Sequence, residues 1–315
     1  MRATVLLPVY NAGPTLDLAL KSVTQQTFTD YEVLVIDDAS TDGSLEAIRR
    51  HEKACPRIRV IAHEKNLGLA ATLNEGLEAA RGNYVARMDQ DDESLPDRLM
   101  AQAAFLDANP KCAVVGSFVY HMGASAAYDR LVALPVTAQE IANTLPNYNC
   151  MYHPATMLRR QTVLDLGGYR EEFKNAEDYE LWLRISRTHR LANIPQPLLR
   201  YRFSMSGMTL GRKWQQMYYV YLAQAAHRHP DAEMATLHEE AKALLAATDR
   251  SYYFSQVLEG TLRELVNLHL WGDAYRLIWG FSREVGWRRS SREALSVMRS
   301  RWQSFASRAH PARTG

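Results

Sequence analysis

Three aspartates within four residues, Asp89, Asp91 and Asp92, follow a short apolar segment and are the residues of this sequence best suited to chemistry. Neighbouring carboxylates repel each other unless a positive group lies between them. Carboxylate oxygens are the ligands that Mg²⁺ and Mn²⁺ prefer, and these ions also bind phosphate oxygens of a substrate. The run therefore predicts a divalent cation that holds a diphosphate. Solvated loops often contain the same pattern, so the motif is weak evidence by itself.

Four apolar segments alternate with amphipathic helical patterns in the first part of the chain, and the last of them leads into the aspartates. This alternation predicts a parallel, doubly wound sheet, because parallel strands need helical crossovers. Ligands of such sheets bind at the carboxyl ends of the strands. The apolar segments are residues 3–8, 31–38, 57–62 and 83–88. Most of the loops that follow them are polar in the manner of a binding site.

Composition and missing motifs exclude several classes of protein. With 47% hydrophobic and 23% charged residues the chain is globular rather than disordered. The three cysteines have no CxxC spacing, which argues against zinc and against a disulfide scaffold. No GxGxxG or GxxxxGK[ST] motif follows the first strand, so a dehydrogenase and a P-loop enzyme fit poorly. No apolar run approaches the ~18 residues of a spanning helix, and we expect a cytoplasmic protein.

The pattern changes along the chain. Beyond residue 110 strand and helix signals are mixed, and after Ser206 only helical ones remain. We therefore expect a first domain over residues 1–205 and a helical region over 206–315. From Arg276 onward the sequence has nine arginines and two acids, which marks the carboxyl end as a separate functional region.

In order and spacing, seven short motifs resemble family 2 of the inverting glycosyltransferases, of the type that builds bacterial cell-surface glycans. The resemblance covers residues 3–205. It implies an α/β fold of the GT-A class, which is a Rossmann-like, mostly parallel sheet flanked by helices, here with a C-terminal helical region. The motifs lie at residues 8–11, 35–42, 66–74, 86–92, 153–154, 167–169 and 176–184.

The resemblance assigns the nucleotide of a sugar donor to the first three strand ends. Asp38 would contact the base, and a carboxylate can accept from a ring N–H, although a turn aspartate is the alternative. Backbone groups of residues 8–11 would lie beside the nucleotide, with Tyr10 and Asn11; for Pro8 a plain strand-to-helix turn is preferred. Asn66 and Gly68 would shape the loop below the diphosphate and ribose, although for Gly68 simple turn geometry explains the residue equally well.

The metal, Mn²⁺ or Mg²⁺, is assigned by the resemblance to Asp91. Asp89 would then contact the ribose or a water of the metal shell. Asp92 could touch the ion or cap a helix expected at residue 94. Arg87 could pair with these carboxylates or with phosphate. Many relatives carry a histidine shortly after the Tyr-Arg pair of the last strand, but none follows Tyr201-Arg202 here, so weak metal binding without donor is expected.

The resemblance assigns the catalytic base to Asp178, at the start of a helix expected over residues 178–187. Leu181, Trp182 and Ile185 form the apolar stripe of that helix, and Asp178 lies on the same side. The positive end of the helix favours the ionised carboxylate that a base needs. Glu177 is a second candidate.

One histidine stays in the second line of candidates. His153 precedes Pro154 at the head of a strand. A lone histidine more often makes structural hydrogen bonds than it takes part in catalysis. We therefore prefer the structural role for His153.

The resemblance implies transfer of a sugar from a nucleotide diphosphate, with uridine diphosphate first, to a glycan or lipid-linked acceptor of envelope polysaccharide or lipopolysaccharide synthesis. A non-catalytic nucleotide-sugar-binding or scaffold protein is the alternative. A sugar-phosphate nucleotidyltransferase ranks lower, because the loop after the first strand has no basic residues. No nucleic acid partner is expected, and a homodimer is left open.

The carboxyl end predicts an amphipathic helix from Trp287. Its apolar side carries Trp302 and Phe305, and an adjoining face is rich in arginine. Such a helix suits the anionic inner face of a membrane. It could equally pack on the catalytic domain or on a second subunit.

Overall fold

The computed structural model describes residues 1–202 and 210–285. Its strands form where the sequence has its apolar segments, and β1, β2 and β4 are buried along their whole length. The strands are β1 (Ala3–Val9), β2 (Tyr31–Asp37), β3 (Ile58–Ala62), β4 (Tyr84–Arg87), β5 (Glu93–Ser94), β6 (Cys112–His121), β7 (Arg130–Val132), β8 (Met157–Arg159) and β9 (Arg190–Tyr201).

Helices connect these strands and then make up the rest of the described chain. They are α1 (Leu16–Thr24), α2 (Ser44–Ala54), α3 (Leu69–Ala79), α4 (Arg98–Ala108), α5 (Ala138–Thr144), α6 (Arg160–Asp165), α7 (Glu177–Ile185), α8 (Leu210–Arg228), α9 (Met234–Ala247), α10 (Arg250–Asn267) and α11 (Trp271–Val285). Three short 3₁₀ helices occur at Gly13–Thr15, Ala126–Tyr128 and His153–Ala155. The predicted C-terminal helical region is confirmed by α8 to α11.

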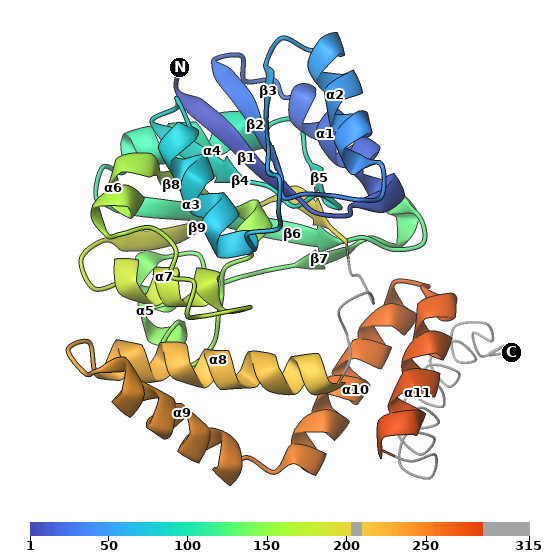
Figure 1. Ribbon diagram of the computed structural model, residues 1–315, viewed down its shortest axis with the longest axis vertical. Coiled ribbons are helices and arrows are strands. Elements are labelled where there is room, and N and C mark those ends of the chain that lie inside the picture. Colours follow the sequence, from blue (N-terminus) through green and yellow to red (C-terminus); the bar gives the residue numbers. More distant parts are fainter. Residues whose placement is uncertain (203–209, 286–315) are drawn as a thin grey trace, which may run out of the picture. The chain divides into compact units, whose positions relative to one another are not determined.

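The strands form a mixed sheet in the order β3-β2-β1-β4-β8-β6-β9-β5, with β7 paired to β6 (Figure 1). The first four are parallel, with β1 between β2 and β4. This arrangement confirms the predicted doubly wound half and brings four strand ends to one edge. The other half of the sheet combines the antiparallel strand β8 with the long parallel pair of β6 and β9.

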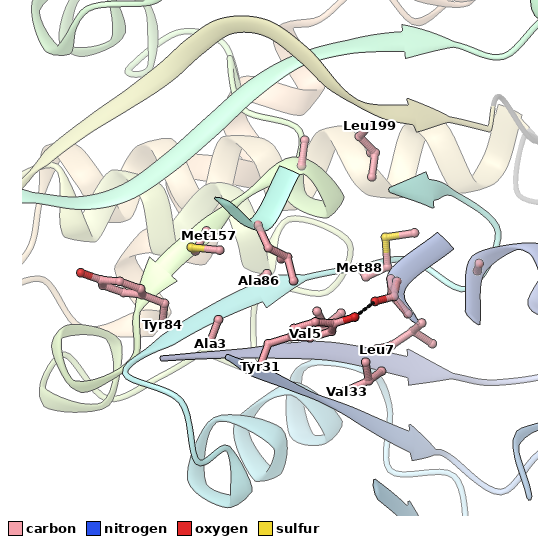
Figure 2. Close-up of a cluster of buried hydrophobic side chains, with 14 of the residues drawn as sticks. Ala3, Val5, Leu7, Tyr31, Val33, Tyr84, Ala86, Met88, Met157 and Leu199 are labelled. Carbon is pink, nitrogen blue, oxygen red and sulfur yellow. Dashed lines mark hydrogen bonds between the residues drawn. The ribbon is translucent and has the colours of Figure 1, made fainter. Parts of the chain in front are cut away.

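Alternate residues of β1 face different helices. Val5 and Leu7 share one buried cluster with α1, α4 and Ile48 of α2, and Figure 2 shows them beside Ala86 and Met88. Leu6 points to the opposite face, where α3 packs on the sheet. Its side chain lies so close to Gly76 of α3 that a β-carbon there would meet Leu6 Cδ1 at 2.3 Å. Helices therefore cover both faces of β1, which fixes the position of its carboxyl end.

The chain divides into two compact units. The first comprises residues 1–121, 131–202 and 219–241, and among the described residues the second comprises 122–130, 210–218 and 242–285. The first unit contains the sheet with helices α1 to α7. In the second, α10 and α11 share a small apolar core around Leu258, Leu262 and Leu277, and Arg130 forms an ion pair with Glu264 of α10.

Some sequence predictions meet a correction or fall outside the described residues. The helix expected at residue 94 is absent there: Glu93–Ser94 form strand β5, paired with Arg200 and Leu199 of β9, and α4 begins only at Arg98. The expected domain boundary at 205 and the amphipathic helix from Trp287 both lie outside the described residues. Within the described part of the chain, no helix has the length and apolarity needed to span a membrane.

Candidate active site

The acidic run directly follows β4 and is surrounded by two arginines. Arg87, the last residue of β4, is 4% exposed and forms an ion pair with Asp89. Arg202, just after β9, donates from Nε to the backbone oxygen of Asp91 at 2.8 Å. Its backbone N–H donates to Oδ1 of Asp92 at 2.7 Å. Strand β9 thus delivers a second positive charge to the three aspartates.

Asp92 does not cap a helix, contrary to one of the two expectations. It is fully buried, and its Oδ2 has no hydrogen-bond partner among residues 1–202 and 210–285. Burial raises the pKa of Asp92 well above its usual range, and the charges of Asp89 and Asp91 add to the rise. Burial also raises the pKa of Asp91, again reinforced by Asp89, while Arg202 and Arg87 oppose it. The negative charges of the run thus oppose one another's ionisation, while Arg87 favours the ionised form of both Asp91 and Asp92.

A divalent cation fits this arrangement chemically. Hard oxygen ligands are what Mg²⁺ and Mn²⁺ prefer, and in the described part of the chain the buried Oδ2 of Asp92 lacks a hydrogen-bond partner. However, no group of three histidine, cysteine or acidic side chains among the described residues could enclose a metal ion. Oxygens of a bound diphosphate and water would have to complete the shell.

The loop after β1 is tied to the acidic run and to the loop after β2. The backbone N–H of Tyr10 donates to Oε1 of Gln90 at 2.8 Å, and Nε2 of Gln90 donates to the Tyr10 oxygen at 3.1 Å. Asn11 has a φ of 49°, and its Oδ1 accepts from the N–H of Thr41 at 2.8 Å. Pro8 is buried inside β1, opposite Ile36 of β2, so it belongs to the strand and not to the turn preferred for it.

Asp38 joins the end of β2 to the loop before α3. Only 4% of Asp38 is exposed, and its carboxylate accepts from the N–H groups of Leu67 at 2.8 Å and Gly68 at 2.9 Å. Asn66 donates from Nδ2 to the backbone oxygen of Asp38 at 3.2 Å. Gly68 has a φ of 89°, which side chains disfavour. The structure thus brings Asp38, Asn66 and Gly68 together, as expected.

A cavity of about 400 Å³ lies beside this loop. One wall is formed by residues 66–71, at the start of α3. The other wall contains Arg170, Lys174 and Glu177, from the segment that leads into α7. The cavity therefore connects the Asn66–Gly68 loop with one of the two candidate bases.

Helix α7 begins at Glu177, one residue before the predicted start, and ends at Ile185. Its predicted stripe is confirmed, because Leu181, Trp182 and Ile185 are fully buried. Asp178 accepts from the N–H of Tyr179 at 2.7 Å through Oδ1 and from Nδ2 of Asn149 at 3.0 Å through Oδ2. These two bonds hold the carboxylate in place.

Burial raises the pKa of Asp178 more than its hydrogen bonds lower it. The sequence predicts that the start of the helix favours the ionised carboxylate. The hydrogen bonds of Asp178 do favour that form, but burial has the larger and opposite effect on its pKa. Burial and the charge of Asp178 raise the pKa of Glu177 to about 7. The charge of Arg87 opposes the rise in both residues, as it does in Asp91 and Asp92. One buried arginine thus links the acidic run electrostatically to the start of α7.

His153 belongs to the support of the site. It is 7% exposed, its Nε2 lies 2.9 Å from the hydroxyl of Tyr169, and its ring contacts Trp182 edge-on. Burial lowers the pKa of His153 well below its usual range, and Arg87 adds to the effect. A neutral histidine packed in this way fits the structural explanation that the sequence favoured.

Comparison with known proteins decides the family. The model of "Glycosyl transferase family 2" matches residues 4–167. The chain is 32% identical over 214 residues to the amylovoran biosynthesis glycosyltransferase AmsE of Erwinia amylovora, covering 67% of this chain and 80% of that protein. The chain belongs to glycosyl transferase family 2. The resemblance read from its motifs is confirmed.

Solved structures show the same fold. S. aureus TarS 1-349 in complex with UDP superposes with a TM-score of 0.58 at 19% identity, over 99% of this chain and 93% of that one. The mannosyltransferase PcManGT from Pyrobaculum calidifontis, in complex with GDP-Man and Mn²⁺, gives 0.59 at 20% identity, over 93% and 87%. The predicted GT-A class is confirmed for this family 2 transferase.

Sequence reasoning misses three residues of the site. Gln90 reads in the sequence only as the spacer between aspartates, yet its amide binds the backbone of Tyr10. Arg202 stands out only for lacking a histidine after it. Asn149, which donates to Asp178, lies in no motif, and nothing in the sequence of this transferase marks it. Each acts through a contact between segments far apart in the chain.

Proposed function

We propose that this transferase moves a sugar from a nucleotide diphosphate donor, with uridine diphosphate first, to a hydroxyl group of a glycan or lipid-linked acceptor, inverting the anomeric centre. The observation that carries the proposal is the position of Arg87. Its charge acts on the acidic run suited to a diphosphate and on the carboxylates of α7 suited to a proton transfer. Arg87 therefore acts electrostatically both on the carboxylates proposed for the leaving diphosphate and on the carboxylate proposed as the base.

In this proposal Asp178 is the general base. Its carboxylate takes the proton of the acceptor hydroxyl while that oxygen forms a bond to the anomeric carbon and the bond to the diphosphate oxygen breaks. A raised pKa suits a base, because proton transfer is most efficient when the pKa lies near the working pH. The bond to Asn149 holds the carboxylate in position. A single displacement needs no second nucleophile, which supports inversion.

The remaining candidates bind the donor. Asp91 would hold Mn²⁺ or Mg²⁺, which neutralises charge on the departing diphosphate, and Asp89 would contact the ribose or a water of the metal shell. Arg87 and Arg202 are the protein's own positive charges at this place. Asp38 and the loop after β1, with Tyr10 and Asn11, would hold the base, while Asn66 and Gly68 shape the adjoining wall. Glu177 and Asp92 remain secondary candidates. His153 has a structural role, through its contacts with Tyr169 and Trp182.

The acceptor class rests on the relative from Erwinia, whose name places it in amylovoran biosynthesis. We propose an acceptor of envelope polysaccharide or lipopolysaccharide assembly, used in the cytoplasm at the inner face of the membrane. A family 2 chain whose carboxylates are intact is poorly explained as a scaffold that only binds nucleotide sugars.

A product assay tests the function. The protein is incubated with UDP-sugars, Mn²⁺ and candidate glycan acceptors, and mass spectrometry follows the products. Release of nucleoside diphosphate with a glycosylated acceptor supports the proposal. Pyrophosphate would identify a nucleotidyltransferase instead, and nucleotide binding without turnover would identify a scaffold.

The metal role is tested with Asp91→Asn, and Asp231→Asn, at an exposed aspartate, is the matched control. We expect Asp91→Asn to lose the Mn²⁺-dependent part of UDP binding in calorimetry while it remains folded. Mn²⁺ should still strengthen UDP binding to the control. Equal metal dependence in both variants would refute the assignment of Asp91.

A further inference from the structure

His63 lies between two carboxylates beside the proposed donor site. It follows β3, and only 7% of its side chain is exposed. Its Nδ1 is 2.7 Å from Oδ1 of Asp38, at the end of β2, and its Nε2 is 2.8 Å from Oε2 of Glu75 on α3. Both ring nitrogens are therefore engaged by acids from two different elements.

The chemistry of these contacts requires a charged ring. A neutral imidazole has one N–H group, so it can donate to only one of two ionised carboxylates. The imidazolium donates to both. Burial disfavours that charge, but the hydrogen bonds to Asp38 and Glu75 outweigh it and raise the pKa of His63 above its ordinary value.

The carboxylate of Asp38 accepts two further hydrogen bonds. Its Oδ1 also accepts from the N–H of Leu67, and its Oδ2 accepts from the N–H of Gly68. A carboxylate offers about four acceptor positions, so His63, Leu67 and Gly68 leave one, on Oδ2. The orientation of that position depends on the carboxylate staying in one rotamer.

We propose that His63 is a positioning residue for the donor: it fixes the Asp38 carboxylate and the loop before α3, so that Oδ2 is held ready to accept from a ring N–H of the nucleotide base. The proposal rests on the proposed function. Glu75 is the second anchor, because it holds the far side of the ring. Without His63, Asp38 would keep its two loop bonds but lose the charged one, so its carboxylate would be held less firmly.

The arrangement makes donor binding depend on pH. The charged groups in contact with His63 are Asp38 from β2 and Glu75 from α3, and Glu64 and Lys65 follow it in the chain. The pKa of His63 is raised, so both contacts are complete at lower pH and one is lost as pH rises through that pKa. Donor affinity should fall in the same direction.

UDP and GDP are the probes, titrated by calorimetry with Mn²⁺ between pH 6 and pH 9. For the full-length wild-type protein we expect the Kd of the preferred nucleotide to rise about tenfold over this range, the size of one hydrogen bond to a charged group. His63→Gln should bind at pH 6 about tenfold more weakly, with a flat profile. Its kcat at saturating donor should stay within about threefold of wild type, since positioning acts in the ground state as well.

Glu75→Gln keeps the experiment decisive if His63→Gln folds poorly, because Glu75 is 41% exposed at its side chain and lies outside the donor contacts. It should move the pH midpoint of nucleotide binding to a lower value. His51→Gln is the matched control, since His51 is also bonded to an acid, Asp17, on the surface; it should leave the profile unchanged.

Three results would overturn the proposal. One is wild-type affinity and pH dependence in His63→Gln, and another is an unmoved midpoint in Glu75→Gln. The third is a wild-type protein that binds neither nucleotide, which would also refute the proposed function. Nucleotide binding and turnover with no dependence on His63 would refute the positioning role alone.

Discussion

The two carboxylate regions of the first unit differ in how far the protein itself satisfies them. Asp38 accepts three hydrogen bonds from His63, Leu67 and Gly68. Asp92 accepts one hydrogen bond, from the backbone N–H of Arg202 to Oδ1. Its Oδ2 is buried and has no hydrogen-bond partner in the described part of the chain. Asp38 therefore acts as a joint between loops, while the acidic run needs a positive or hydrogen-bonding ligand to complete it.

The carboxylates of the acidic run and of the start of α7 have perturbed pKa values. Burial raises the pKa of Asp91, Asp92, Glu177 and Asp178, and in Asp91, Asp92 and Glu177 neighbouring acids add to the rise. Groups with strongly perturbed pKa values gather at functional sites more often than elsewhere. We therefore propose that metal, diphosphate and proton transfer belong to the acidic run and the start of α7, and each prediction below tests a carboxylate there.

The largest effect is expected at Asp178. Asp178→Asn keeps the shape and the contact with Asn149 but removes the base, so kcat should fall by about 10²–10⁴. The Kd for UDP should stay within about threefold, because a base acts in the transition state. Mass spectrometry measures turnover and calorimetry measures binding. Asp165→Asn, on the exposed side of α6, is the control, and turnover within about tenfold of wild type would transfer the role to Glu177.

Much of the parallel half of the sheet, and of the site at its strand ends, can be predicted from sequence because the residues of each pattern are close together in the chain. The strand ends, the run of three aspartates and the start of α7 are local patterns. Such patterns predict that Asp38 and Asp91 follow the carboxyl ends of strands, whereas Asp178 is assigned through the family resemblance of residues 176–184.

The second half of the sheet is harder to predict, because its contacts join distant segments. Strand β5 is two residues long and exists through its pairing with β9, so a local pattern at Ser94 suggests a helix instead. Arg202 reaches Asp91 and Asp92 because β9 pairs antiparallel with β5, the strand that follows the acidic run. Asn149 reaches Asp178 across 29 residues of chain. Hydrogen bonds of this kind leave no periodic signal.

An intermediate effect is expected at Glu177, through pH. Its pKa is about 7 in the fold, above the ordinary value of 4.5. A raised acid pKa favours the fold while the group is protonated, and this contribution is lost as pH rises through about 7. Glu177→Gln stays neutral, so it should raise the Tm at pH 8 by several degrees, on the order of 1–3 kcal/mol. At pH 4 the Tm should hardly change.

The activity of the same variant gives a second readout. Burial and the charge of Asp178 raise the pKa of Glu177 to about 7, so Glu177 is still protonated where Asp178 ionises, and Glu177→Gln should leave the acid limb of the kcat profile in place. Scanning calorimetry and a pH series of initial rates measure the two effects. A shift of the acid limb would show that Glu177 is ionised before Asp178, and a Tm gain that is equal at both pH values would refute the burial of a charged Glu177.

The smallest effect is expected at Asn149, which touches the reacting group only through Asp178. Its Nδ2 donates to Oδ2 of Asp178, and this bond lowers the pKa of a carboxylate that burial raises. Asn149→Ala removes the bond, so the pKa of Asp178 should rise further and less base should be ionised at pH 7. We expect kcat to fall about threefold to tenfold there, within the range of one hydrogen bond to a charged group.

The rate of Asn149→Ala should recover as pH increases, which separates a positioning role from simple damage. Oδ1 of Asn149 also accepts from the N–H of Met151 at 3.2 Å, so the variant can lose stability as well, and its Tm is measured beside the rates. Asn143→Ala, at an exposed asparagine on α5 that bonds Gln139, controls for the truncation itself. A deficit in kcat that is the same from pH 6 to pH 9 would mean that Asn149 supports the loop before His153 and does not tune Asp178. Recovery at high pH with an unchanged Kd for UDP would tie the residue to the base, and would show that the start of α7 is tuned by a contact that no motif contains.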